Sequence, residues 1–228
     1  MKNILFVTGM HGNEVIPIFA LASQGIPQIV ANPKALSLGK RFLDCDLNSS
    51  FGIKGDGYEI KRAKEILGFI PKNSLVVDLH TFSAGSEPFV VIVDKKMIKF
   101  ACQTGLKRIV LMEHNIKKGN ALINHRNGIS VEVGNHKNYK SFFTALRVVD
   151  KIKAGKVESK GVNLYSVFGI IKKRGKYVNF KQHKDGFIPV LAGEKAYNFY
   201  GLKAKKLHLN NEFIASGQQG KMKTRRQF

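Results

Sequence analysis

The stretch NILFVT at residues 3–8, followed directly by GMHGNE at residues 9–14, decides the fold of this 228-residue chain. Its first six residues are almost continuously apolar, which is typical of a β-strand covered on both faces, as in a parallel sheet. The residues that follow predict a helix over Glu14–Ser23, in which Pro17 is tolerated because it falls in the first turn. A strand, a glycine-containing turn and a helix in this order favour an α/β fold.

The same alternation of apolar and amphipathic segments continues as far as residue 155. Strands are predicted at Gln28–Ala31, Ser74–Asp78, Phe89–Val93, Ile109–Met112 and Gly128–Val133, and helices at Tyr58–Phe69, Lys95–Thr104 and Tyr139–Lys153. Beyond Gly155 only short alternating segments follow. These are Leu164–Ile171, Tyr177–Phe180 and Lys205–Leu209.

Three regions are therefore expected. Residues 1–155 form an α/β domain with a mixed, largely parallel sheet flanked by helices. Residues 156–215 form a small all-β C-terminal domain, and residues 216–228 have no apolar periodicity and are predicted to be a disordered tail.

The composition excludes several classes of protein. An apolar content of 43% describes a globular core, and no apolar run approaches the roughly 20 residues that span a bilayer, so no membrane partner is expected. The first residues show no signal-peptide pattern. The two cysteines, Cys45 and Cys102, cannot form a disulfide framework, and a reducing cytoplasm is the simplest location.

The net charge of +22 is confined to one part of the chain. Residues 1–94 hold nine basic and nine acidic side chains, whereas residues 95–228 hold 29 basic and 7 acidic ones. This surplus attracts an anionic substrate, a nucleic acid or an anionic surface, or else it is lysine scattered over solvated faces. We favour the second interpretation and keep nucleic-acid binding as an alternative.

His11 and Glu14 lie where the first strand ends and the first helix begins. Ligands collect beyond the carboxyl ends of strands in open α/β sheets, so this is a suitable place for a site. The competing interpretation is that His11 caps the helix and Glu14 is a solvated acid of its first turn.

Two more polar positions interrupt apolar strands. Asp78 and His80 follow Leu75-Val76-Val77 and project to the same side, because alternate residues of a strand share a face. Glu132 lies in Ile129–Gly134, within an inner strand, where a carboxylate is costly unless it is paired or belongs to a site.

Together these side chains can form a catalytic zinc site. Two histidines and one carboxylate with an open fourth position are the ligands of a catalytic zinc, whereas structural zinc is closed by four protein ligands. His11, Glu14 and His80 supply that set for one Zn²⁺ per chain, and Glu132 remains as a base.

With these residues in view, the chain resembles the succinylglutamate desuccinylase/aspartoacylase family of zinc carboxypeptidase-like amidohydrolases. The resemblance runs in order along the sequence to about residue 209. It rests on His11-Gly12-Asn13-Glu14, Asn32-Pro33, Arg41–Phe51, Tyr58–Ile66, Asp78-Leu79-His80, Glu132-Val133-Gly134 and, more weakly, Pro189–Tyr197.

The resemblance implies a zinc-carboxypeptidase-like fold and a role for each matching residue. It makes His11, Glu14 and His80 the zinc ligands and Glu132 the general base. Arg41 would polarise the scissile carbonyl. Asn48 and Tyr197 would bind substrate, although Tyr197 also fits the interpretation of a core aromatic.

One position departs from the family pattern. The family has an arginine directly after the asparagine, where it anchors a substrate carboxylate, but here the residue is Ser49, which cannot replace a guanidinium clamp. A second family arginine has only Arg126 as its nearest counterpart.

The predicted function is zinc-dependent hydrolysis, in the cytoplasm, of the amide of an N-acyl amino acid or a similar small, anionic acylated amine. The alternatives are a carboxypeptidase- or esterase-like zinc hydrolase on a larger substrate, and a non-catalytic protein that binds anions or RNA on this scaffold.

Overall fold

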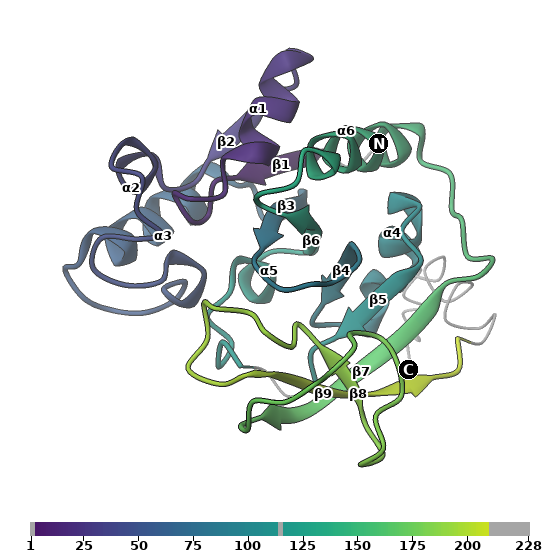
Figure 1. Ribbon diagram of the computed structural model, residues 1–228. Coiled ribbons are helices and arrows are strands. Elements are labelled where there is room, and N and C mark those ends of the chain that lie inside the picture. The colour runs from purple at the N-terminus through teal and green to yellow at the C-terminus, as the bar shows by residue number, and fades with distance from the viewer. Residues whose placement is uncertain (1–2, 114–115, 210–228) are drawn as a thin grey trace, which may run out of the picture.

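The computed structural model describes residues 3–113 and 116–209, and within them nine strands form one sheet in the order β2-β1-β3-β6-β4-β5-β7-β9-β8 (Figure 1). Four parallel strands make one half of the sheet, and β4 joins it antiparallel to β6 before β5 runs parallel to β4. The predicted mixed, largely parallel sheet is confirmed. The bounds are β1 Ile4–Thr8, β2 Gln28–Val30, β3 Leu75–Phe82, β4 Phe89–Ile92, β5 Arg108–Leu111 and β6 Gly128–Asn135.

Helices cover both faces of this sheet. On one face α1 (Val15–Ser23), α4 (Ile98–Ala101) and α6 (Lys140–Ala154) bury their apolar side chains in one large core cluster against β1, β3, β4 and β6. On the other face α3 (Tyr58–Phe69) and α5 (Leu122–His125) pack with alternate residues of β1 and β3. Because side chains alternate along a strand, neighbouring apolar residues of β1 enter the two opposite cores. The short elements are α2 Pro33–Ser37, η1 Leu47–Ser49, η2 Lys95–Met97 and η3 Cys102–Thr104.

The C-terminal strands continue the same sheet. β7 (Asn163–Ile171) pairs in parallel with β5, and it pairs antiparallel with β9 (Gly201–Leu207), which in turn pairs with β8 (Ile188–Val190). The expected C-terminal β-structure is present and joined edge to edge to the main sheet. The domain division at residues 155 and 156 stays a prediction, and the predicted tail at 216–228 lies outside the described residues.

Several predicted elements differ from the observed ones, including β3, which runs four residues past its predicted end at Asp78. The segment Lys95–Thr104 is not one helix but the succession η2, α4 and η3, in which the Thr104 hydroxyl bonds the Ala101 carbonyl and competes with regular helical bonding. Residues 177–180 are not a strand, since Phe180 has a left-handed φ of 62° that ends extended pairing. β9 begins at Gly201, four residues before the predicted start.

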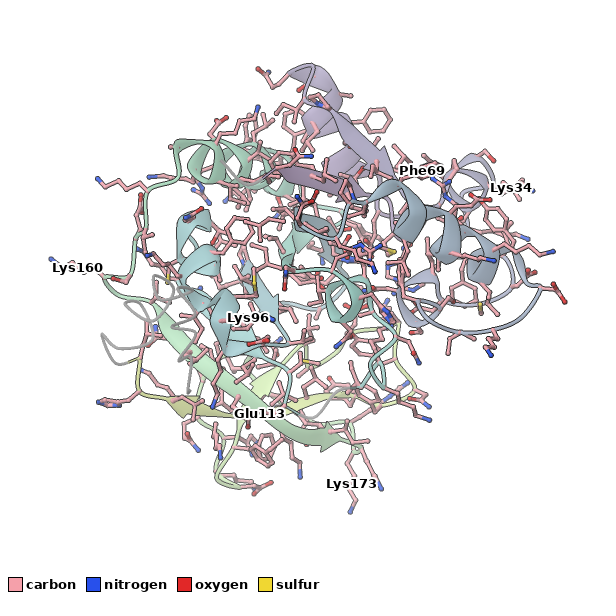
Figure 2. The ribbon with its side chains drawn as sticks, turned by 180° about the vertical axis from the view of Figure 1, so that it is seen from behind. Lys34, Phe69, Lys96, Glu113, Lys160 and Lys173 are labelled. Atoms are coloured by element: carbon pink, nitrogen blue, oxygen red, sulfur yellow. The ribbon has the colours of Figure 1, made fainter. Side chains whose placement is uncertain are left out.

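Lys34, Lys160 and Lys173, labelled near the outline of the molecule in Figure 2, are exposed, as is Lys96 in the middle of that view. Among the described residues no helix combines the length and apolar character needed to cross a membrane.

Candidate active site

His11, Glu14 and His80 converge on one point at the carboxyl end of the parallel strands. His11 and Glu14 come from the connection between β1 and α1, and His80 lies within β3. The Nδ1 atoms of His11 and His80 lie 2.6 Å and 3.0 Å from the two carboxylate oxygens of Glu14. All three side chains are buried, and their ligand atoms lie within 4.8 Å of one another.

Two glycines allow the β1–α1 connection to take this shape. Gly9 has a φ of 60°, a left-handed conformation that glycine adopts without a steric cost. A Cβ on Gly12 would come within 2.3 Å of the Lys40 carbonyl oxygen, so only glycine permits the segment at 35–41 to approach. The Gly12 N–H donates to the Arg41 carbonyl over 3.0 Å, which holds Arg41 beside His11.

The interpretation that His11 caps α1 does not agree with the structure. Glu14 occupies the position before the first helical turn, and no side-chain hydrogen bond caps the helix there. Glu14 is only 2% exposed, so it is not a solvated acid.

In both histidines the other ring nitrogen, Nε2, lies next to a carboxylate. His80 Nε2 lies 2.7 Å from Asp78 Oδ2, and His11 Nε2 lies 3.2 Å from Asp46 Oδ1. A carboxylate on the far nitrogen fixes the orientation and tautomer of a metal-binding histidine and makes it a better ligand. Two imidazoles and a carboxylate, supported in this way, fit a divalent metal ion with nitrogen and oxygen ligands.

The charges of this cluster are strongly coupled. Although burial alone would raise it, the pKa of Glu14 lies well below its usual range because His11 and His80 face the carboxylate. Burial opposes a charge on His80, but Asp78 and Glu14 raise the pKa of His80 well above its ordinary value. The cluster therefore attracts positive charge, which a metal cation supplies as well as a proton does.

Glu132 is a half-buried residue whose carboxylate lies next to this cluster. It lies on β6 directly opposite His80 of β3 in the parallel register. Its Oε2 is buried and has no hydrogen-bond partner among the described residues. Burial, reinforced by the nearby charges of Glu14 and Glu194, raises the pKa of Glu132 to about 7, although His80 acts in the opposite direction. A carboxylate with this pKa can both accept and donate a proton near neutral pH.

Two cations lie around the mouth of the site. The Arg41 guanidinium lies 2.9 Å from His11 Nε2 and 3.6 Å from a Glu14 oxygen. Lys117 donates to Asp46 Oδ2 over 2.7 Å and to Ser49 Oγ over 3.1 Å. Both side chains line the small cavity that reaches His11, Glu14 and Glu132.

Asn48 and Tyr197 line the same cavity from two distant segments. The Asn48 amide oxygen accepts the Leu122 N–H over 3.2 Å, which fixes the side chain against α5. Tyr197 is half-buried, and burial raises the pKa of its hydroxyl, so that hydroxyl stays protonated and can donate a hydrogen bond.

Two other glutamates hold the loops that deliver these groups. Glu59 of α3 is fully buried and accepts the backbone N–H groups of Leu43, Asp44 and Cys45 over 2.7, 3.0 and 3.4 Å. Glu194 accepts the Ser83 N–H and hydroxyl, each over 2.8 Å. Glu59 thus shapes the segment between Arg41 and Asn48, and Glu194 ties the segment before Tyr197 to the end of β3.

Arg126 does not join the other sequence-predicted residues. Its guanidinium donates to the backbone carbonyls of Leu67, Ile70 and His125, so it holds the end of α3 against α5. It lines neither of the cavities that contain Glu132.

The sequence interpretation gave no role to Lys117 and none to Asp46. Asp46 stands in the quoted Arg41–Phe51 motif, two residues before Asn48. That position was available in the sequence and could have marked Asp46 as a candidate site residue. Lys117 is one of 23 lysines in the strongly basic residues 95–228, and nothing in the sequence sets it apart.

Comparison with known proteins agrees with this geometry. Residues 1–142 match the family model of the succinylglutamate desuccinylase/aspartoacylase catalytic domain. A probable aspartoacylase of Prochlorococcus marinus (strain MIT 9313) is 33% identical over 121 residues, which cover 43% of this chain and 40% of that protein. The chain thus matches less than half the length of this curated relative.

Solved structures share the fold over most of the chain. Succinylglutamate desuccinylase from Chromobacterium violaceum superimposes with a TM-score of 0.69 at 16% identity, covering 91% of this chain and 85% of that one. Murine aminoacylase 3 superimposes with a TM-score of 0.68 at 19% identity, covering 90% and 95%. At these identities the likeness concerns the fold alone. With a family model that spans more than half of the sequence, the chain belongs to the succinylglutamate desuccinylase/aspartoacylase family.

Proposed function

We propose that this protein is a zinc-dependent hydrolase that cleaves the amide bond of an N-acyl amino acid or a similar small acylated amine. The observation that carries the proposal is the convergence of His11, Glu14 and His80 beside Glu132, whose buried Oε2 has no hydrogen-bond partner among the described residues. Curated relatives named as aspartoacylases support the same class of reaction.

The three buried ligands would hold the zinc ion, with Asp78 and Asp46 orienting the two imidazoles. When bound, zinc supplies Lewis acidity, which polarises a carbonyl group and makes a water molecule more acidic. Nitrogen and carboxylate ligands with room for a further ligand are the donor set that catalytic zinc uses.

Glu132 moves the proton. Glu132 lines the cavity of the metal cluster, and its Oε2 has no hydrogen-bond partner among the described residues, so it is available to take a proton from the attacking water and pass it to the departing amide nitrogen. An amine is a poor leaving group until it is protonated, so this transfer is needed for the carbon–nitrogen bond to break.

The cations at the mouth bind and polarise the substrate. Arg41 is placed to stabilise negative charge that develops on the carbonyl oxygen. Lys117 stands beside Ser49 and offers a positive charge to a substrate carboxylate where the family's arginine is missing. Tyr197 and Asn48 supply neutral hydrogen-bonding groups on either side of the cavity.

The test is a substrate panel with the purified, zinc-loaded chain. N-acyl amino acids, their esters and short peptides are incubated in parallel, and released amine and bound zinc are measured. One zinc per chain with turnover of N-acyl amino acids is expected. Cleavage restricted to peptides or esters would replace the amidohydrolase assignment with the carboxypeptidase- or esterase-like alternative, and absence of zinc binding would overturn the proposal altogether.

A further inference from the structure

Glu132 also lines a second cavity. This cavity shares five lining residues with the cavity of the metal cluster: Asn48, Lys117, Glu132, Leu191 and Tyr197. The two cavities therefore adjoin one another at the proposed base. A molecule that presents a bond to Glu132 can extend part of itself into this second space.

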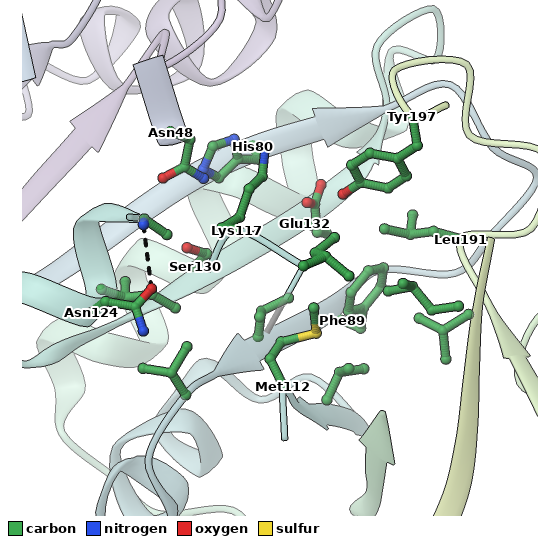
Figure 3. Close-up of a pocket in the computed structure, with 18 residues that line it drawn as sticks. Asn48, His80, Phe89, Met112, Lys117, Asn124, Ser130, Glu132, Leu191 and Tyr197 are labelled. Carbon is green, nitrogen blue, oxygen red and sulfur yellow. Dashed lines mark hydrogen bonds between the residues drawn. The ribbon is translucent and has the colours of Figure 1, made fainter. Parts of the chain in front are cut away.

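The walls of the second cavity are apolar. Figure 3 shows Asn48, His80, Lys117, Glu132 and Tyr197 along one side and hydrocarbon side chains on the other. We call the latter region the apolar pocket. Strands β4, β5 and β9 and the end of β8 supply its walls, which include Phe89, Val91, Val110, Met112, Leu191 and Leu202.

Two polar atoms in the pocket wall already have partners within the protein. The Ser130 hydroxyl points to Asp78 Oδ2 at 3.4 Å, and the Asn124 amide oxygen accepts the Ala121 N–H over 3.3 Å. The charged side chains of the lining, His80, Lys117 and Glu132, all lie on the side of the shared opening (Figure 3). A carboxylate placed deep in the pocket would thus lose its hydration without gaining a charged partner, which is strongly unfavourable.

The pocket is large enough for several carbon atoms. Its cavity volume is about 70 Å³, whereas a cavity of only ~10–15 Å³ is enough to hold one water. An apolar space of this size gains more from a hydrocarbon group than from water, because water there finds few polar partners.

We propose that the apolar pocket binds a neutral hydrocarbon chain of the substrate, so that the preferred substrate is an amide with such a chain next to the scissile bond and a carboxylate at the mouth. The inference rests on the proposed amidohydrolase function and specifies its substrate class. Arg41 and Lys117 hold the anionic end, and the chain extends past Glu132 over the pocket-facing side chains of β4 and β5. Short or doubly charged acyl groups leave the pocket unfilled or place a charge in it.

The chain can belong to the acyl group or to the amino acid, and two isomers separate these sources. N-hexanoylglycine carries the hydrocarbon on the acyl side, and N-acetylnorleucine carries the same carbons on the amine side. N-acetylglycine has neither. One of the isomers should exceed N-acetylglycine in kcat/KM by at least roughly tenfold, since each buried methylene contributes about a three- to fourfold gain. Two isomers no better than N-acetylglycine would overturn the proposal.

Binding gives a readout that does not depend on turnover. Calorimetry with the zinc-loaded protein compares hexanoate with acetate and with adipate, which replaces the terminal methyl by a carboxylate. Hexanoate should bind at least about tenfold more tightly than either. If no N-acyl compound is cleaved but hexanoate shows this preference, the proposed function fails and the pocket assignment stands. If N-acyl compounds are cleaved but hexanoate shows no preference, only the pocket assignment fails.

A larger side chain in the wall of the apolar pocket tests whether the preference for hydrocarbon chains arises there. Val91 is half-buried in the pocket wall on β4, and Val91→Phe should lower hexanoate affinity about tenfold and reduce the preference for the longer isomer. Val162→Phe makes the same change at a half-buried valine outside the pocket and should leave both unchanged. If Val91→Phe misfolds, Val91→Ala tests the same wall, since it should shift the preference towards octanoate. Equal behaviour of all three variants and the wild type would exclude this pocket.

Discussion

Glu132 on β6 lies directly opposite His80 on β3, and this parallel pairing sets the proposed base beside one of the proposed metal ligands. Both residues belong to inner strands of the sheet, so their separation is fixed by backbone hydrogen bonding and does not depend on a loop. Metal ligation is assigned to His80 and proton transfer to Glu132, so substitutions of the two residues should have different effects.

Glu132→Gln should keep the metal and lose activity. The amide has nearly the shape of the carboxylate but cannot accept the proton, so kcat should fall by about 10²- to 10⁴-fold. His80→Ala removes a ligand and should lower both zinc content and activity. Elemental analysis and steady-state kinetics on the same samples check this. Turnover by Glu132→Gln close to that of the wild type would show that another group is the base.

The activity should fall at acidic pH as Glu132 becomes protonated. The pKa of Glu132 is raised to about 7 by burial, and only the unprotonated carboxylate can act as a base. Therefore kcat/KM should rise with pH and level off, with a midpoint at or below about 7 because a bound cation favours the charged form. Zinc content measured at each pH separates this protonation from loss of metal. A flat profile between about pH 5 and pH 8 with zinc retained would rule out the assigned base.

Glu59→Gln should destabilise the segment that carries Arg41 and Asn48. The carboxylate accepts three backbone N–H groups, and its loss should cost about 1–3 kcal/mol in the free energy of unfolding. Glu65→Gln on the same helix, where Glu65 pairs with Arg62 near the surface, is the matched control and should cost less than about 1 kcal/mol. Chemical denaturation measures both.

The Glu59 effect should also depend on pH. Despite its burial, these hydrogen bonds lower the pKa of Glu59 below the ordinary 4.5. A group whose folded pKa is depressed contributes stability above its unfolded pKa and loses it as pH falls through the folded pKa. The difference between the wild type and Glu59→Gln should thus be constant above about pH 5.5 and shrink below about pH 4.5. A difference that grows in acid would contradict the hydrogen-bonding assignment.

Lys117→Met should weaken binding of substrates that carry a carboxylate. Removing a charge-assisted partner should raise KM about tenfold for an N-acyl amino acid, with a smaller change in kcat. The corresponding amino-acid amide, which lacks the carboxylate, should show little change. Lys118→Met is the adjacent control, since Lys118 lines neither cavity. Because Lys117 also bonds Asp46, zinc content must be measured in parallel. An equal rise of KM for acid and amide would assign Lys117 to positioning Asp46 alone.

The sequence by itself determined the α/β architecture and the candidate ligands. Continuous apolar runs such as residues 3–8 have a strong local signal, because a strand covered on both faces excludes polar residues. For the same reason Asp78, His80 and Glu132 stand out, since polar groups within such strands are costly without a function. The helix after β1 was predicted to within one residue of Val15–Ser23.

Only the tertiary structure decided what surrounds those residues. The nearness of Glu132 to His80 depends on strand register, and the nearness of Lys117 to Ser49 depends on how two segments 68 residues apart are folded together. The sequence could not show that Arg126 bonds backbone carbonyls, because an arginine in that role has no characteristic local sequence pattern. The apolar pocket was equally hidden: its walls come from strands whose residues look like ordinary core, and a cavity is a property of how side chains pack together.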